Sequence, residues 1–335
     1  MFKIKLILGG LLLGALVLIL LTIPLWLSLA MTINLLVPSG AWRPLTLVTS
    51  PPTHLDTVVS SNSGRELTVR TYTGHNADRG GLVIYTPFIG GGLDDERLVN
   101  LAETFARAGF VVAIPWQSDA TLTVNQKDSA DVIATILHLQ QEAGVNRVGI
   151  FGISYGSGPA AAAVVDDRVS QDISFLVSLN GFANLDSLVA FVRTGQSEYQ
   201  DTTIKREPHS YTQELLDNTL AANQATDIEQ FLTSDRYRQL RQSLSPALLL
   251  GSDIQQTSLP PVFLIHSTDD AYIPYTETLQ LHDRLRTLGR VSLLALTDVV
   301  QHGTYRPITF ATLRQKYLPT ALDFTQLVRS LLAIS

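Results

Sequence analysis

The sequence contains no cysteine, which excludes disulfides, thiolate catalysis, iron–sulfur clusters and zinc–thiolate sites. Charged residues are also scarce, at 16% of the chain, and the formal net charge is −6. Because Lys3 and Lys5 account for two of the 24 basic residues, the remainder carries 22 basic and 30 acidic residues. Such an acidic body has no electrostatic reason to bind nucleic acid. The chain also has no His-Glu-x-x-His motif, and we expect neither a metal ion nor another cofactor.

The N-terminal segment is a long run without charge, from Leu6 to Val37. About 20 apolar residues suffice to cross a bilayer as a helix, so we predict that residues 1–37 form a transmembrane anchor whose partner is the lipid bilayer. Lys3 and Lys5 precede the run and favour a cytoplasmic N-terminus, which puts the catalytic domain on the outer, periplasmic or extracellular side. The alternative is a secreted protein, because Ser28-Leu-Ala30 is typical of a signal-peptide cleavage site.

The rest of the chain predicts an α/β fold. Residues 38–53 are rich in Pro, Ser and Thr and indicate a linker, and the folded domain is expected over residues 54–335. Strand patterns alternate with helical ones, which predicts a mostly parallel central sheet with helices on both faces. Polar, helix-favouring sequence at about 184–258 predicts an inserted helical lid. The predicted strands are 55–60, 66–72, 81–87, 110–115, 147–152, 175–179, 262–266 and 291–296, and the helices include 95–108 and 126–143.

The motif Gly152-Ile-Ser154-Tyr-Gly156 follows one of these strands and precedes a run of small residues. In that context G-x-S-x-G indicates a nucleophile elbow, a strained strand-to-helix turn that exposes the serine. Ser154 is therefore the predicted nucleophile. The backbone N–H of Tyr155 would form one half of an oxyanion hole at the start of a helix.

A serine hydroxyl needs a base, and the base needs an acid that orients it; both should follow later in the chain. Asp269 and Asp270 come directly after the predicted strand 262–266, and either can reach the same sheet edge as Ser154. His302 follows the last predicted strand and is the predicted base. Asp298 lies four residues before His302 and is a weaker rival for the acid.

These three motifs, in this order, resemble those of the α/β-hydrolase superfamily, from about Thr68 to the C-terminus. The resemblance implies the α/β-hydrolase fold and a serine hydrolase. In that superfamily the loop written here as His266-Ser-Thr-Asp-Asp-Ala-Tyr-Ile-Pro274 carries the acid at the position of Asp270, and Asp269 would brace the loop.

The segment Thr86-Pro-Phe-Ile-Gly-Gly-Gly92 departs from the His-Gly found in many members, and Phe88 or Ile89 should supply the second oxyanion N–H. The stretch Ile89-Gly-Gly-Gly-Leu93 is also similar to acyl-CoA thioesterases and bile-acid-CoA acyltransferases.

The function expected from the sequence is a membrane-anchored serine hydrolase that cleaves a carboxylic ester, of a lipid-like or otherwise hydrophobic kind, through an acyl-enzyme. Its partner would be a small-molecule ester or thioester. Two alternatives stay open: an acyltransferase or thioesterase with the same three residues, and a non-catalytic binding protein on the same fold. Some apolar lid residues either line an acyl pocket or pack the lid itself, namely Phe191, Tyr199, Tyr211, Leu215 and Phe231.

Overall fold

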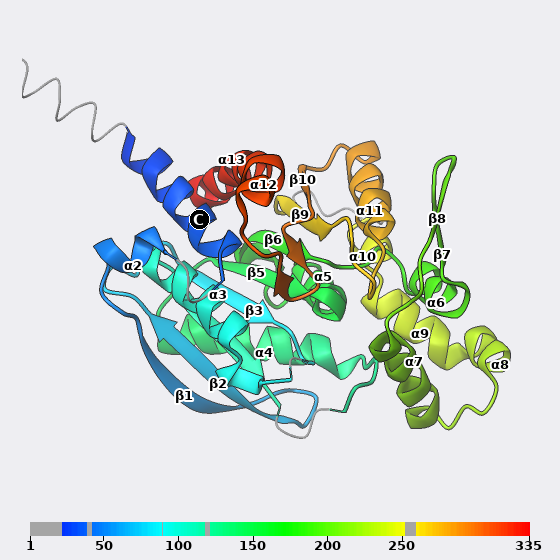
Figure 1. Ribbon diagram of the computed structural model, residues 1–335. Helices are drawn as coiled ribbons and strands as arrows, with labels where there is room; N and C mark the ends of the chain where they lie inside the picture. Colours follow the sequence, from blue (N-terminus) through cyan, green and yellow to red (C-terminus); the bar gives the residue numbers. More distant parts are fainter. Residues whose placement is uncertain (1–21, 39–41, 89, 118–120, 252–258) are drawn as a thin grey trace, which may run out of the picture.

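The computed structural model describes residues 22–38, 42–88, 90–117, 121–251 and 259–335, and its centre is an eight-stranded sheet (Figure 1). The strand order is β1-β2-β4-β3-β5-β6-β9-β10. Strand β2 runs antiparallel to β1 and β4, and all other neighbours are parallel. The predicted mostly parallel sheet is therefore confirmed.

All eight predicted strands are present, with ends within two residues of those expected. Strands β3 and β9 are buried along their whole length, because helices cover both faces of the sheet, and this explains their continuous apolar sequences. The bounds are β1 Thr53–Ser60, β2 Glu66–Thr73, β3 Gly81–Tyr85, β4 Val111–Trp116, β5 Val148–Ile153, β6 Ile173–Leu179, β9 Val262–Ser267 and β10 Ser292–Thr297.

The core has two halves, one on each face of the sheet. Successive residues of β3 point to opposite sides, so Leu82 and Ile84 belong to one cluster while Val83 and Tyr85 belong to the other. The first cluster lies under α3 (Glu96–Arg107), α13 (Leu318–Ile334) and a helix over residues 22–36. The second lies under α4 (Lys127–Glu142), α5 (Ser157–Val164) and α11 (Tyr275–Thr287).

A helical insertion occupies the region in which we predicted a lid, between β6 and β9. It lies to one side of the sheet, on the right in Figure 1. A short hairpin of polar sequence, which the sequence analysis did not anticipate, interrupts the helices. The insertion contains α6 (Leu185–Thr194), β7 (Gln196–Tyr199), β8 (Thr202–Lys205), α7 (Ser210–Ala222), α8 (Ile228–Thr233), α9 (Asp235–Leu244) and α10 (Pro246–Leu249).

The N-terminal boundaries differ from those we predicted. Helix 22–36 packs on the domain with Met31 and Leu36 in its core, and α2 (Pro44–Val48) places Leu45 there as well. The bounds predicted for the anchor, 1–37, and for the linker, 38–53, therefore include residues that belong to the folded domain. The sequence could not separate the two, because apolar residues are equally suited to a protein core and to a bilayer. No helix in the described part of the chain is long and apolar enough to cross a membrane. Residues 1–21 lie outside the described residues.

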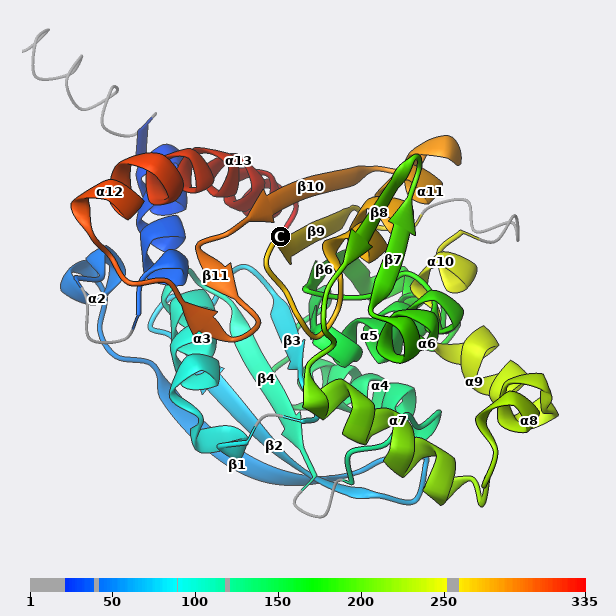
Figure 2. The same ribbon diagram turned by 45° about the vertical axis from the view of Figure 1, so that its right-hand side comes forward.

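After β10 the chain forms a small hairpin and then returns to the sheet. Strands β11 (Val300–Gln301) and β12 (Thr304–Tyr305) pair antiparallel, so His302 and Gly303 form the turn between them. The chain continues through α12 (Phe310–Thr312) and a π-helical turn, Leu313–Tyr317, into α13. The hairpin lies next to α3 (Figure 2), and Arg97 of that helix donates a hydrogen bond to its turn. The remaining short helical turns are η1 (Gly92–Asp94), η2 (Ser154–Gly156) and η3 (Ser170–Asp172).

Candidate active site

Ser154 sits on the sharp turn that we predicted from its motif. It follows β5 directly, opens η2, and has a φ of 56°, which is a strained conformation for a residue with a side chain. The flanking glycines make the turn possible. A Cβ on Gly152 would lie 2.8 Å from the carbonyl oxygen of Gly156, and one on Gly156 would lie 2.4 Å from the carbonyl oxygen of Tyr85. The strain and the close packing are those of a nucleophile elbow.

His302 and Asp270 form a short hydrogen bond at the same edge of the sheet. Nδ1 of His302 lies 2.6 Å from Oδ2 of Asp270, whose side chain is fully buried. The other oxygen, Oδ1, accepts backbone N–H bonds from Tyr272 at 2.7 Å and Ile273 at 3.1 Å. Burial raises the pKa of Asp270, whereas the hydrogen bond from His302 and its charge lower the pKa. The lowering effects outweigh burial, so the pKa of Asp270 lies below its usual value. The geometry fixes an ionised acid against the imidazole.

Ser154 and His302 both line one cavity, together with Tyr155 and Phe88. Among the described residues no hydrogen bond joins the Ser154 hydroxyl to the imidazole. Bonds of this kind often tighten only when a substrate is bound. The catalytic roles of Ser154, Asp270 and His302 therefore stay predictions that rest on position.

The His302 ring is held from one side by an aromatic stack. It lies against Tyr272 with ring centroids 4.1 Å apart and an angle of 16° between planes, and Tyr272 stacks in turn on His209 of the lid at 4.0 Å. The hairpin is held by α3, because Nη1 of Arg97 in that helix donates a hydrogen bond to the carbonyl oxygen of Gly303 at 3.2 Å. The predicted base therefore has a defined ring plane and lies on a braced turn.

The rival carboxylates have other partners. Asp269 forms an ion pair with Arg306, as expected of a residue that braces the loop. Asp298 forms an ion pair with Lys316 and directs no bond to His302. Only Asp270, among the three acids that we considered, contacts the predicted base.

The other histidine of the acid loop, His266, is a structural residue. It is completely buried, with Nδ1 2.6 Å from the hydroxyl of Thr278 and Nε2 2.9 Å from the carbonyl oxygen of Ile273. Burial lowers the pKa of His266 to about 4, so the ring is neutral at physiological pH. It holds the backbone of the loop that carries Asp270.

The two predicted oxyanion positions lie on facing loops. Tyr155 follows Ser154 as the second residue of η2, and its ring stacks on Phe88 with centroids 5.1 Å apart. The hydroxyl of Tyr211 in the lid donates to the carbonyl oxygen of Phe88 at 2.9 Å. This contact ties the carbonyl group of Phe88 to the lid. Ile89, the other predicted source of the second N–H, lies outside the described residues. The lid thus contacts the loop that was predicted to supply the second N–H.

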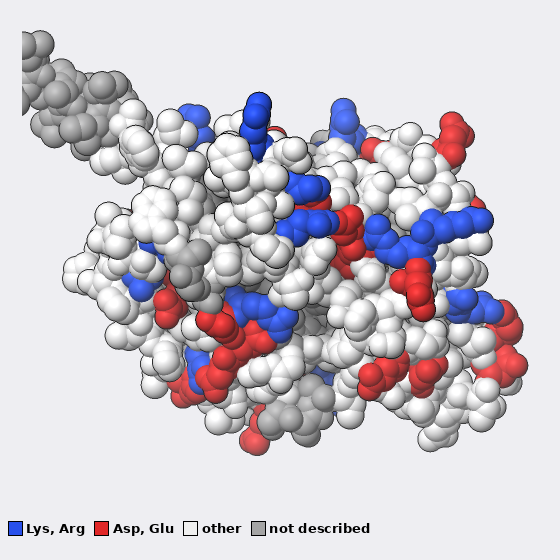
Figure 3. Space-filling model, viewed as in Figure 1, with Lys and Arg blue, Asp and Glu red and all other residues white. Residues whose placement is uncertain are grey.

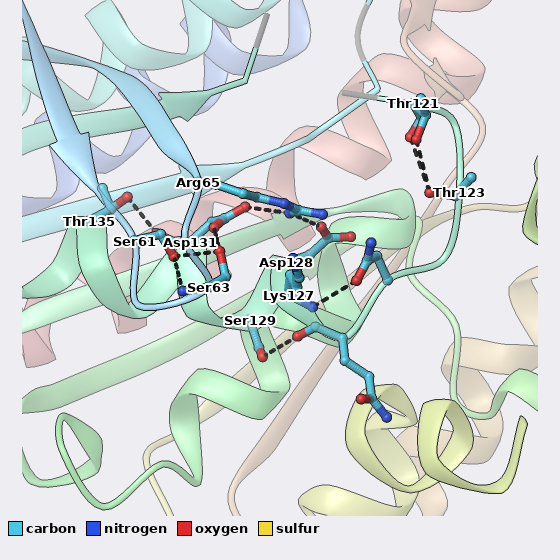
Figure 4. A network of polar contacts seen from close by, with 12 residues as sticks. Ser61, Ser63, Arg65, Thr121, Thr123, Lys127, Asp128, Ser129, Asp131 and Thr135 are labelled. Carbon is cyan, nitrogen blue, oxygen red and sulfur yellow. Dashed lines mark hydrogen bonds and ion pairs between the residues drawn. The ribbon is translucent and has the colours of Figure 1, made fainter. Parts of the chain in front are cut away.

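Tyr155 is also tied to a buried polar network, whose members Arg65, Asp128 and Asp131 are drawn in Figure 4. Its hydroxyl donates to Oδ2 of Asp128 at 2.8 Å and accepts the backbone N–H of Asn125 at 3.0 Å. Nη1 of Arg65 reaches between Asp128, at 2.6 Å, and Asp131, at 2.8 Å. Burial raises the pKa of Asp128 to about 6, although the bonds from Arg65 and Tyr155 oppose the shift. The network anchors the residue that follows Ser154.

A cavity of about 340 Å³ extends from Ser154 into the apolar layer between the sheet and helices α3 and α13. Its walls are mainly aliphatic and aromatic, and Leu35 of helix 22–36 forms part of them. Among the lid residues with an open role, Tyr211 and Leu215 line this cavity, whereas Phe191 and Phe231 are buried in packing. The hydroxyl of Tyr199 lies 2.5 Å from Asp283. The walls toward α3 and α13 include Leu98, Leu101, Phe105, Phe324, Leu327, Val328 and Leu331.

Sequence reasoning missed the residues that hold the site in place. Tyr272 stands inside the acid loop that we quoted, but its partner His209 is 63 residues away. Arg97 and the Asp128 network likewise act across long sequence separations. The local signal for the network was a pair of acidic residues, Asp128 and Asp131, three positions apart at the start of a predicted helix.

Comparison with known proteins places this geometry in a family. The model of the prolyl oligopeptidase family matches residues 102–318, which include all three candidate catalytic residues. The chain belongs to the prolyl oligopeptidase family. It has the α/β-hydrolase fold, as do serine hydrolases of known structure. No curated protein matches its sequence.

Solved structures of this superfamily share the fold at low identity. Acylaminoacyl peptidase of Pyrococcus horikoshii superposes with a TM-score of 0.58 at 16% identity, over 88% of this chain and 43% of that one. A puromycin-hydrolysing peptidase of Mycobacterium tuberculosis gives 0.55 at 14% identity, over 84% and 39%. The esterase Pf2001 of Pyrococcus furiosus gives 0.50 at 15% identity, over 88% and 96%. The chain thus spans less than half the length of the two peptidases and nearly all of the esterase.

Proposed function

We propose that this family member hydrolyses esters of hydrophobic carboxylic acids through an acyl-enzyme, with Ser154 as nucleophile, His302 as base and Asp270 as orienting acid. The observation that carries the proposal is the 2.6 Å contact between the buried Asp270 and His302, because His302 lines the same apolar cavity as the strained Ser154. Nothing in packing requires these three residue types together at the ends of three strands.

In the first half of the proposed reaction, Nε2 of His302 takes the hydroxyl proton of Ser154 while Oγ attacks the ester carbonyl. The backbone N–H groups of Tyr155 and of Ile89 or Phe88 stabilise the oxyanion. His302 then gives its proton to the departing alkoxide, and an alcohol leaves. In the second half, His302 deprotonates a water molecule that attacks the acyl-enzyme carbonyl. The bond between Oγ of Ser154 and the acyl carbon then breaks, His302 returns the proton to Oγ, and the carboxylic acid leaves.

The cavity supports an apolar acyl group. Its walls beyond Ser154 consist of side chains such as Leu101, Phe324 and Leu327, which offer hydrocarbon contacts and no charge. Each methylene that enters such a site gains about 0.8 kcal/mol, close to fourfold in affinity. We expect kcat/KM to rise along a series of p-nitrophenyl esters from acetate to decanoate.

Replacing Leu327 with Trp tests this assignment, because the larger side chain would extend from α13 into the cavity and reduce its volume. We expect Leu327→Trp to lower kcat/KM for the decanoate by about tenfold or more and to leave the acetate nearly unchanged. Leu322→Trp is the matched control, since Leu322 lies on the same helix and is 75% exposed. An unchanged chain-length profile in Leu327→Trp would place the acyl group elsewhere.

Amide cleavage is the second candidate, because the chain belongs to a family named for a peptidase and two similar structures are peptidases. Matched ester and anilide substrates with one acyl group decide between the two. An acyltransferase would show an added alcohol or amine competing with water for the acyl-enzyme, and a thioesterase would prefer the matched thioester.

We also propose that the N-terminal segment holds the enzyme at a membrane, with the N-terminus in the cytoplasm and the domain outside. The support is the sequence: residues 6–26 carry no charge and amount to 21 residues, enough for one helical span. Protease accessibility of the domain in intact and opened cells tests the orientation. Release of a shortened chain into the medium would favour cleavage and secretion.

A further inference from the structure

One side of the domain exposes large apolar side chains from three separate segments. Helix 22–36 exposes Trp26, the segment at α2 exposes Trp42 and Val48, and the C-terminal region exposes Phe310 and Leu322. Their exposed fractions run from 64% to 83%. Scattered single residues of this kind are ordinary, whereas a gathered set of this size marks an interaction surface.

The three segments form one continuous surface, because they are bonded to one another. The side chain of Asn34 accepts the backbone N–H of Leu45 at 3.2 Å, which joins helix 22–36 to α2. The hydroxyls of Thr325 and Thr32 lie 3.3 Å apart and join the same helix to α13. Figures 1 and 2 both show helix 22–36, α2, α12 and α13 side by side. We call this the N-terminal face.

Charge is sparse on the part of this face that helix 22–36 and α2 form, and the upper-left part of Figure 3 is mostly white there. The part near α12 and α13 also carries exposed charged residues, among them Arg314 and Asp323. Arg43, the residue directly before α2, is buried and donates hydrogen bonds to Asn34 and Asn100. The part formed by helix 22–36 and α2, next to the N-terminal segment, therefore suits the acyl boundary of a bilayer better than a polar partner.

The sequence outside the described residues identifies what covers the face. Residues 6–21 are uncharged and join the domain at Thr22, at the end of helix 22–36 on this side. Once that run enters a bilayer, the lipid lies directly against the apolar side chains next to its exit. Tryptophans near the end of an apolar span are typical of the membrane–water interface, and Trp26 and Trp42 occupy that position.

We propose that the N-terminal face lies on the lipid bilayer, with Trp26, Trp42, Val48 and Phe310 immersed in its interfacial layer. The domain is then fixed in orientation and does not hang free on a tether. The elements that form this face on one side line the cavity on the other, through Leu35, Phe324 and Leu327. If the proposed ester hydrolysis holds, substrate acyl chains reach Ser154 from the bilayer.

Tryptophan quenching tests the placement without any activity measurement. The full chain, which has three tryptophans, is reconstituted into vesicles of phosphatidylcholine and phosphatidylglycerol with or without brominated acyl chains. Variants retain Trp42 alone, retain Trp116 alone, or carry F310W or Q239W with all three native tryptophans replaced by Phe. Trp116 lies partly buried at the end of β4, and Gln239 is exposed on α9 at the opposite side of the molecule.

We expect brominated lipid to quench Trp42 and the F310W probe about twofold or more, and to leave Trp116 and the Q239W probe nearly unchanged. Trp26 alone is not decisive, because an anchor would bring it to the bilayer in any orientation. Unquenched Trp42 and F310W probes in reconstituted protein would overturn the proposal. If these probes stay unquenched and Leu47→Cys chains form cross-linked dimers, the face instead binds a second copy of the chain.

A paired substitution separates this inference from the proposed function. Leu47→Glu with Val48→Glu adds two charges to α2, away from the cavity walls. We expect the pair to reduce Trp42 quenching and to slow hydrolysis of an ester embedded in vesicles, with no change toward dissolved p-nitrophenyl acetate. Unchanged quenching would refute the docking surface, whereas inactivity of wild type on every ester would refute only the proposed function.

Discussion

Replacing Asp270 with Asn should disable the base while leaving its position intact. In the structure Oδ1 of Asp270 accepts two backbone N–H bonds, from Tyr272 and Ile273. The amide oxygen of Asn is the one group that can take over these bonds, so the amide NH2 must occupy the place of Oδ2. It then donates to Nδ1 of His302, and the imidazole proton moves to Nε2. A protonated Nε2 cannot accept the hydroxyl proton of Ser154.

The wrong tautomer removes general-base catalysis and the stabilisation of the imidazolium. We expect kcat to fall by about 10⁴, which corresponds to about 5 kcal/mol of transition-state stabilisation. KM should change little, because Asp270 is buried behind His302. Thermal unfolding and circular dichroism establish that the variant is folded.

The assay is steady-state hydrolysis of a short p-nitrophenyl ester by the full chain in detergent. Asp269→Asn and Asp298→Asn are matched controls, since these carboxylates pair with Arg306 and Lys316 instead. We expect each to retain activity within about tenfold of wild type. A folded Asp270→Asn enzyme with near-normal kcat, or a larger loss in Asp269→Asn, would refute the tautomer argument.

Three further predictions concern the scaffold of the site. Burial lowers the pKa of His266 from 6.5 to about 4, so the imidazole binds a proton more readily in the unfolded chain than in the folded one. The neutral, buried His266 therefore contributes its full stabilisation above pH 6.5, and that contribution is lost as the pH falls toward 4. Denaturant unfolding should therefore show that wild type loses about 2 kcal/mol more than His266→Gln between pH 7 and 5, and equal losses would contradict the shift. Gly156→Ala forces a Cβ to 2.4 Å from a backbone oxygen and should cost about 3 kcal/mol or more, against about 1 kcal/mol for Gly144→Ala in open space; similar costs would disprove the packing argument. Tyr155→Phe leaves Asp128 without one bond and should lower the free energy of unfolding by about 1–3 kcal/mol, and an unchanged midpoint would argue against the network.

The central sheet could be predicted from the sequence because buried parallel strands have a local signature. Segments such as Leu82–Tyr85 are apolar throughout and are bounded by turn residues, so neither periodicity nor long-range information was needed. The elbow at Ser154 was predictable for the same reason, since its glycines and its flanking strand and helix are contiguous.

The features that escaped prediction depend on contacts between distant segments. Apolar residues over 22–36 fit a membrane span and a core equally well, and only the packing of Met31 and Leu36 separates the two. The hairpin β7–β8 is polar and pairs only with itself, which leaves no hydrophobic pattern to read. The stack of His209 on Tyr272 joins lid and acid loop across 63 residues.

The most direct test of the account is covalent labelling of the nucleophile. The purified full chain is treated with a fluorophosphonate probe, which reacts only with an activated serine, and compared with Ser154→Ala and His302→Ala variants of equal thermal stability. We predict rapid labelling of wild type at Ser154, located by mass spectrometry, and its loss in both variants. Folded wild type that takes up no probe, or labelling that persists in Ser154→Ala, would contradict the assignment of Ser154 as a hydrolase nucleophile.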